Sequence, residues 1–190
     1  MVMLAAMGIV APIEARSAPL LVRHLFERGD PGPLLATLAH VPELLEMAAP
    51  FLSVALGPSS IELRTKELVI LRTSALMGCP FCTLTHAGMA RRAGIARDEV
   101  KALVQPGPIP ADLLDPGDRA LVAWVDAVVA GDPAGAAAAR GEVQDRFGEA
   151  GLVELVAVVG ATMMLAVFSR TLELSPDART VERLASEGLA

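Results

Sequence analysis

Two cysteines and one histidine lie close together in the sequence and are the residues best suited to carry out chemistry. The chain of 190 residues contains 2 cysteines and 3 histidines. Both cysteines belong to one Cys-x-x-Cys segment, Cys79 and Cys82, and His86 follows four residues after the second. In a protein of this composition, the pair predicts either redox chemistry or metal binding.

The expected local geometry favours a reactive thiolate at Cys82. Gly78 predicts the end of one helix, and Cys79 can cap a new helix whose first turn holds Pro80. Cys82 then lies near the third helical position, where free backbone N–H groups favour an anion. Cys82 and His86 are four residues apart and share one helix face. The imidazole can therefore accept the thiol proton or, when protonated, stabilise the thiolate.

A carboxylate, Glu67, interrupts the apolar stripe of the preceding predicted helix, residues 62–76, with Ser74 on the same row. Residues 59–62 match a Ser-x-x-Glu capping box, which predicts where this helix begins. Burial of a charge costs free energy unless the charge is paired or neutralised. We therefore expect Glu67 to have a partner or a functional role. The helical wheel alone does not bring Glu67 to the cysteines.

The spacing of these residues resembles that of the alkylhydroperoxidase D / carboxymuconolactone decarboxylase-like family. Eleven residues separate Glu67 from Cys79, and three separate Cys82 from His86. A Cys-x-x-Cys alone is a weak signal, whereas the spaced four-residue motif is specific. The flanking sequence fits as well, at residues 67–72, 78–82 and 93–95.

The resemblance implies an all-α fold, a multi-helical alkylhydroperoxidase D-like single domain that assembles as a homo-oligomer, either a trimer or a hexamer. It is strong over residues 40–105 and looser as far as residue 176. We therefore expect one domain, with its parts in this order: an N-terminal arm at 1–20, a family-like core at 40–176 and a C-terminal helix at 177–190, all within 1–190.

The resemblance also implies a redox disulfide that reduces hydroperoxides. Cys82 matches the peroxide-reactive cysteine and Cys79 the resolving one, while Glu67 and His86 match a proton relay. No cofactor and no metal are expected, and the implied partners are a hydroperoxide and an external dithiol, or a thioredoxin- or lipoyl-type reductant. The sequence departs from the pattern at Phe81, where some members carry a second histidine, so one proton carrier is absent.

Three other interpretations remain open. The four motif residues supply zinc ligand types, although structural zinc sites more often use spaced pairs from separate segments. A carboxymuconolactone decarboxylase-like enzyme is a second alternative, but that branch of the family does not depend on a cysteine pair. A non-catalytic oligomeric binding protein is the third, because the apolar content is high.

Composition narrows the possible functions. Hydrophobic residues make up 53% of the chain, which favours extra burial such as an oligomer interface. A net charge of −6 and 3% aromatic residues, with no tyrosine, argue against nucleic-acid binding. Two cysteines do not form a secreted disulfide scaffold. We therefore expect a cytoplasmic protein that binds neither nucleic acid nor membrane.

Helical patterns cover most of the chain and no strand alternation appears, so the residues themselves also indicate an all-α class. The proline-rich segment 105–116 predicts a surface connection. Residues 152–168 are strongly apolar but contain Glu154 and fall short of a span of about 20 residues, so they predict a buried helix rather than a membrane helix. The remaining predicted helices are 20–28, 43–56, 79–93, 97–104, 118–130, 134–147, 151–174 and 177–189, and the segment 34–40 is short and apolar.

Overall fold

The computed structural model describes residues 8–105, 107–176 and 178–189, and within these ranges it contains helices and no strand. The first seven residues of the predicted arm lie outside this description. The 3-10 helices are η1 (Ala15–Ser17) and η2 (Leu20–Phe26). The α-helices are α1 (Pro33–Leu38), α2 (Pro42–Leu56), α3 (Leu63–Leu76), α4 (Pro80–Arg92), α5 (Arg97–Leu103), α6 (Pro116–Ala130), α7 (Pro133–Thr171) and α8 (Ala178–Ser186). The all-α prediction is therefore confirmed.

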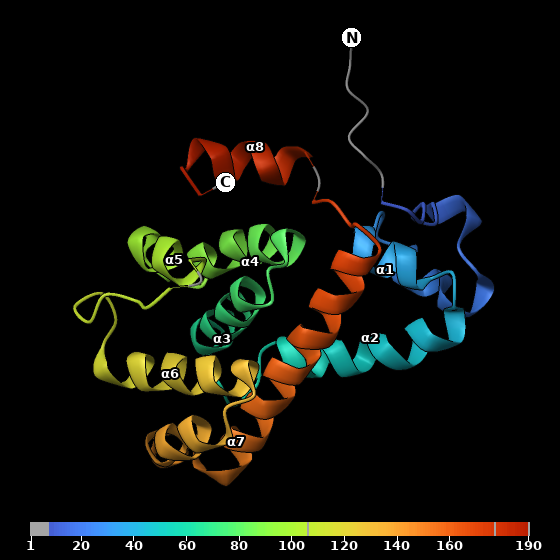
Figure 1. Ribbon diagram of the computed structural model, residues 1–190. Helices are drawn as coiled ribbons and strands as arrows, with labels where there is room; N and C mark the ends of the chain where they lie inside the picture. The colour runs from blue at the N-terminus through green and yellow to red at the C-terminus, as the bar shows by residue number, and fades with distance from the viewer. Residues whose placement is uncertain (1–7, 106, 177, 190) are drawn as a thin grey trace.

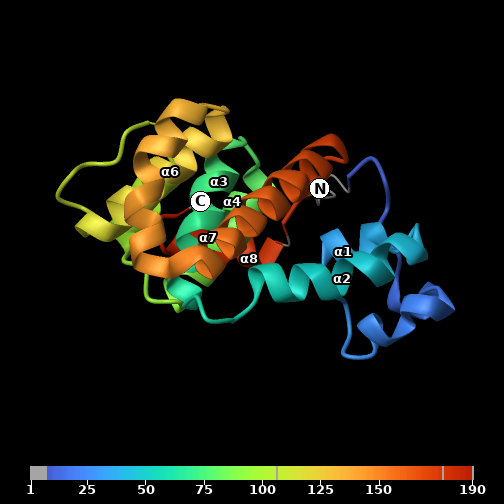
Figure 2. The same ribbon diagram turned by 90° about the horizontal axis from the view of Figure 1, so that it is seen from below.

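Helix α3 occupies the centre of the molecule. It packs against α4, α5, α6 and α7, and Figures 1 and 2 both show it enclosed by these helices. Every residue from 65 to 74 is buried. The N-terminal elements η2, α1 and α2 form a separate group beside the second half of α7, with their own apolar cluster that includes Val22, Phe26 and Leu45.

The capping box predicted for α3 is wrong. The helix begins at Leu63, and the Glu62 side chain makes no capping hydrogen bond. The Ser59 hydroxyl instead accepts a hydrogen bond from the Ile61 N–H at 3.0 Å and donates one to Glu154 of α7. Ser59 therefore bonds to Ile61 and to Glu154, and not to the first N–H groups of α3.

Two apolar segments that were predicted as separate helices join in α7. Gly148 lies between them with φ of 70° and ψ of −178°, which is not a helical conformation. Such a positive φ suits glycine, because it has no Cβ. Figure 1 shows the resulting change in direction, after which the second half of α7 crosses α2 and α3. This second half brings the helix to the cysteine pair.

A buried arginine in α3 anchors the proline-rich connection. Arg72 is 1% exposed and donates from Nε and Nη2 to the two carboxylate oxygens of Asp126, at 2.6 and 2.8 Å. It also donates to the carbonyl oxygens of Gln105 at 2.6 Å and Gly107 at 3.0 Å. One side chain thus joins α3, α6 and the connection that follows α5.

A buried lysine in α3 holds the end of α2. Lys66 is fully buried, and its Nζ donates to the carbonyl oxygens of Ala55 at 3.0 Å and Gly57 at 2.6 Å. These are carbonyls at the helix end, where intrahelical donors run out. Glu154 lies 2.6 Å from the same nitrogen and balances its charge. This arrangement fixes α2 against α3 and α7.

The Glu154 contact predicts a loss of stability in acid. Burial alone would raise the pKa of Glu154, but hydrogen bonds from Lys66 and Ser59 outweigh it and hold the pKa below its ordinary value of 4.5. A lowered folded-state pKa contributes stability above the ordinary value, which is lost as the pH falls through the folded value. Urea unfolding should therefore show a steeper loss below pH 4.5 for the wild type than for Glu154→Gln. Equal slopes for the two proteins would contradict this, and Glu149→Gln on the same helix controls for a lost charge.

Two helices carry apolar residues that face solvent. On α2, the predicted helical spacing is correct and Leu52, one of the residues that show it, faces inward with Leu45 and Ala55. Three others that show the spacing, Leu44, Met47 and Phe51, face solvent. We name the exposed residues the α2 stripe (Leu44, Met47, Phe51 and Val54) and the α7 stripe (Val153, Val156, Met164 and Val167). Their exposed fractions lie between 49% and 73%. The prediction that α7 is buried on most sides is wrong for this face.

The length and apolar character of α7 are features that membrane-spanning helices share. Within the described residues, α7 alone is long and apolar enough to cross a membrane by length and composition. Its most apolar window is 44% buried inside the protein. Core helices of soluble proteins also have these properties, because contact with several neighbours selects apolar residues.

Candidate active site

The start of α4 positions the cysteine pair as the sequence predicts. Cys79 caps the helix, Pro80 occupies its first position, and the Cys82 N–H donates to the Cys79 sulfur at 3.2 Å. Gly78 has φ of 59°, the left-handed conformation expected of a glycine between two helices. Cys82 therefore lies in the first turn of α4, close to the positive end of the helix dipole.

The two cysteines form a disulfide with a Cα–Cα distance of 5.3 Å. Cys79 is 1% exposed and Cys82 is 6% exposed. Both pack against Ala166 of α7 and Leu174, which follows α7. The disulfide thus lies beneath an apolar cover.

Glu67 and His86 contact each other between α3 and α4. The Nδ1 atom of His86 lies 2.9 Å from Oε2 of Glu67, and the Glu67 side chain is fully buried. With Nδ1 occupied, Nε2 remains the nitrogen available for exchange of a proton. The second carboxylate oxygen, Oε1, has no hydrogen-bond partner among the described residues. The carboxylate therefore orients the histidine and does not contact the cysteines directly.

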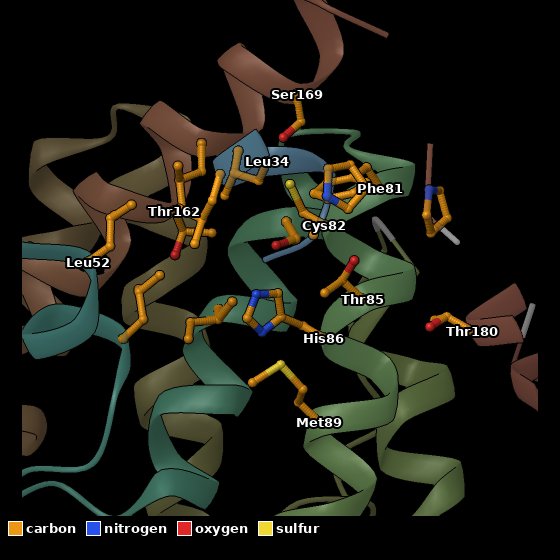
Figure 3. Close-up of a pocket in the computed structure, with 18 of the residues that line it drawn as sticks. Leu34, Leu52, Phe81, Cys82, Thr85, His86, Met89, Thr162, Ser169 and Thr180 are labelled. Atoms are coloured by element: carbon orange, nitrogen blue, oxygen red, sulfur yellow. The ribbon is translucent and has the colours of Figure 1, made fainter. Parts of the chain in front are cut away.

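A cavity of about 580 Å³ borders one of the two cysteines. Along α4 it is lined by Cys82, His86 and Met89, whereas Cys79 does not line it. Figure 3 shows the Cys82 sulfur and the His86 ring on the same side of this cavity. Most of its wall is apolar and comes from other helices, through Leu34, Leu35, Leu52, Leu56, Ile70 and Leu165. The volume and lining are typical of small-molecule sites.

Three buried hydroxyl groups also line the cavity, and one of them, Thr162, donates to the Val158 carbonyl oxygen at 2.8 Å. Ser74 and Ser169 have no hydrogen-bond partner for Oγ among the described residues. Buried polar groups normally have partners, so these oxygens are suited to contact a bound molecule or water. Ser74 lies on the row of Glu67 and was noticed from the sequence. Ser169 was missed, because a single serine in an apolar helix has no spacing signal.

Phe81 forms part of the same cavity wall. It is 9% exposed and packs with Cys82 and Leu174. Figure 3 places its ring beside Cys82. The position where some members of the resembled family carry a second histidine is therefore apolar in this protein.

The zinc alternative gains no support from the geometry. Both cysteine sulfurs are used in the disulfide. Across the described part of the chain, no three His, Cys, Asp or Glu side chains converge in a way that could hold a metal ion.

Comparison with known proteins extends these observations. Residues 42–112 match the carboxymuconolactone decarboxylase family, and this range contains Glu67, Cys79, Cys82 and His86. No curated protein matches the sequence. The resemblance derived from the motif is confirmed.

Solved structures of similar fold cover nearly the whole chain. An uncharacterised peroxidase-related protein from Ralstonia eutropha JMP134, an alkylhydroperoxidase AhpD core, has 16% identity and a TM-score of 0.75, covering 93% of this chain and 95% of that one. A similar peroxidase-related protein from Silicibacter sp. TM1040 has 15% identity and a TM-score of 0.70, with coverages of 93% and 92%. A variant of the debrominase Bmp8 in complex with 2,3,4-tribromopyrrole has 16% identity and a TM-score of 0.75, with coverages of 97% and 98%. These structures share the fold of this protein.

Proposed function

We propose that this alkylhydroperoxidase D-like chain, matched over residues 42–112 to the carboxymuconolactone decarboxylase family, is a thiol-dependent hydroperoxide reductase. The observation that carries the proposal is that Cys82, but not Cys79, borders a cavity that also holds His86. A reactive thiol needs both access to substrate and a nearby base. The arrangement thus supports Cys82 as the peroxide-reactive residue and Cys79 as the resolving one.

The first half of the reaction oxidises the cysteine pair. In the reduced enzyme, His86 accepts the Cys82 proton, and the thiolate attacks one oxygen of the hydroperoxide. The O–O bond breaks, Cys82 becomes a sulfenic acid, and the alkoxide takes the proton back to leave as an alcohol. The Cys79 thiol then attacks the sulfenic sulfur, so that a disulfide forms and water leaves.

The second half of the reaction restores the thiols. One thiolate of an external dithiol attacks the disulfide to give a mixed disulfide. Its second thiol displaces the enzyme thiolate, so the dithiol leaves oxidised and both cysteines are reduced. In sum, one hydroperoxide and one dithiol become one alcohol, one water and one disulfide. We place this activity in the cytoplasm, where such dithiols are kept reduced.

A direct test follows the two thiols. The reduced protein should contain two titratable thiols and, after one equivalent of cumene hydroperoxide, none. Its intact mass should fall by about 2 Da, as expected for an internal disulfide. Two thiols that stay unchanged would remove the peroxidase proposal.

Glu67→Gln should lower kcat for peroxide reduction by about a hundredfold, the usual scale for acid–base assistance. Glutamine keeps the size of the side chain but loses the carboxylate that orients His86. Steady-state kinetics with cumene hydroperoxide and dithiothreitol would measure this, and Glu62→Gln at the exposed start of α3 is the matched control. Wild-type turnover by Glu67→Gln would exclude the relay.

The apolar cavity favours one second candidate, the reductive removal of bromine from a small aromatic ring. A wall of leucines beside Cys82 suits such a ring. The ring would gain hydrogen, bromide would leave, and the two thiols would become the disulfide. Bromide release from 2,3,4-tribromopyrrole, measured against cumene hydroperoxide turnover under the same conditions, separates the two functions.

We also propose that the α2 and α7 stripes are covered by further copies of this chain, in the trimer or hexamer that the resemblance implies. Eight large apolar side chains facing water are typical of an interaction surface. Light scattering after size exclusion should give a multiple of 19.8 kDa for the wild type. Met47→Glu with Val54→Glu should lower this mass, and Glu46→Gln on the same helix should not. A monomeric wild type would contradict the assembly.

A further inference from the structure

Two arginines stand at the outer end of the cavity. Arg92 is the last residue of α4 and Arg183 belongs to α8, and both line the cavity. Both are exposed, whereas Cys82 and Ser169 at the other end are buried. The cavity therefore runs from a buried thiol and hydroxyls to a cationic mouth.

Gly88 lets the two guanidinium groups approach each other over α4. A β-carbon at this position would lie 2.6 Å from Nη2 of Arg183 and 3.8 Å from Nη1 of Arg92. Both side chains thus converge on one point of the helix surface. Two like charges repel each other, so this arrangement favours an anion between them.

In the part of the chain that the structure describes, Arg92 and Arg183 are not paired with an acidic side chain, unlike the arginines that join helices elsewhere in this protein. Among the described residues, no aspartate or glutamate lines the cavity, and neither Arg92 nor Arg183 has a carboxylate partner. Arg64, Arg72 and Arg146, by contrast, each pair with an acidic side chain. The charge at the cavity mouth is therefore left for a ligand, even though the chain as a whole carries a net charge of −6.

Helix α4 sets the spacing between the two ends. Cys82, His86, Met89 and Arg92 recur at three or four residues and all line the cavity, so they follow one face of the helix. Arg92 lies ten positions after Cys82, which corresponds to about 15 Å along the axis. The wall between these ends is apolar, through Leu35, Leu52, Leu56 and Ile70.

We propose that Arg92 and Arg183 form a carboxylate-binding subsite, and that the cavity accepts an elongated hydroperoxide with an apolar body and a carboxylate at its far end. The guanidinium fork matches the geometry of a carboxylate and pairs with it through two parallel hydrogen bonds. This orientation places the apolar body along α4 and the peroxide near Cys82. The substrate class rests on the proposed function of the same site, but the anion subsite can be tested without it.

The binding test uses ligands that cannot react. Isothermal titration calorimetry of the disulfide form should show decanoate binding more tightly than decanol. Arg92→Gln and Arg183→Gln should each weaken decanoate binding about tenfold, the equivalent of one charge-assisted hydrogen bond. Decanol binding should stay unchanged in both variants. Arg179→Gln, on α8 but outside the cavity lining, is the matched control.

The turnover test uses linoleic acid hydroperoxide and its methyl ester. Each arginine variant should lose about tenfold in kcat/KM with the acid and keep the wild-type value with the ester and with cumene hydroperoxide. Arg183→Lys should recover part of the loss, because it restores the charge without the fork.

The outcomes separate the two proposals. Equal binding of decanoate and decanol, or equal losses for acid and ester, would overturn the carboxylate subsite while leaving peroxide reduction intact. Selective decanoate binding in a protein that turns over no peroxide would support the subsite and overturn the peroxidase. Uniform loss of turnover with every substrate in the arginine variants would assign these residues to the stability of α8 and overturn the subsite.

Discussion

Replacing Cys82 by serine should abolish hydroperoxide turnover, lowering kcat/KM at least about a thousandfold. A hydroxyl is a far weaker nucleophile than a thiolate at neutral pH, and removal of a nucleophile is among the costliest changes in an enzyme. Cys82 is also the cysteine that borders the cavity. The residual thiol of Cys79 is 1% exposed and is therefore shielded from the substrate.

Cys79→Ser is the matched variant, and its result should differ in kind. It keeps the reactive thiol but cannot form the disulfide, so one equivalent of hydroperoxide should leave a sulfenic acid, about 16 Da heavier. Intact mass and a sulfenic-acid probe would measure this. If Cys79→Ser fails to react while Cys82→Ser is oxidised, the roles of the two cysteines are reversed.

Arg72→Ala should destabilise the protein by about 2–5 kcal/mol, the usual cost of truncating a large buried side chain to alanine. The change removes the bidentate contact with Asp126 and both bonds to the carbonyls of Gln105 and Gly107. It also leaves a space within the central helix. The connection after α5 would lose its attachment to α3.

Urea unfolding followed by circular dichroism would measure this loss, with Arg140→Ala as the control, because Arg140 is exposed on α7. Asp126→Asn should cost less, since the Asp126 side chain is 37% exposed and the arginine keeps its two carbonyl partners. An Arg72→Ala protein as stable as the control would show that the connection is held by other contacts.

Features fixed by neighbouring residues were predictable from the sequence. The cap at Cys79, the proline in the first turn and the position of Cys82 each depend on a few adjacent residues, and all three are confirmed. The glycine between α3 and α4 follows the same rule, because a positive φ selects it.

Features that depend on packing between distant segments were not predictable from the residues alone, although the family resemblance implied that Glu67 and His86 act together. The contact between Glu67 and His86 requires α3 to lie across α4, and a helical wheel describes one helix at a time. Likewise, the charged residues Lys66 and Arg72 make the sequence of α3 look unlike that of a central helix. These charges can be buried because carbonyls and acids from other elements pair with them. The opposite error occurs in α2, where the apolar residues Met47 and Phe51 follow helical spacing, as core residues would, but face solvent.

The accessibility of the two sulfurs has a consequence for the order of events. Cys79 is buried and does not line the cavity, whereas Cys82 does. The peroxide and the dithiol must therefore reach Cys82 through the same cavity, one after the other. The kinetics should therefore be ping-pong. At high concentration the peroxide should inhibit by occupying the disulfide form of the enzyme, and the dithiol should inhibit by occupying the reduced form. The burial of Cys82, which is 6% exposed, also selects among reductants. A dithiol on a slender, flexible arm can reach Cys82 where a cysteine pair held on the surface of a folded protein is blocked.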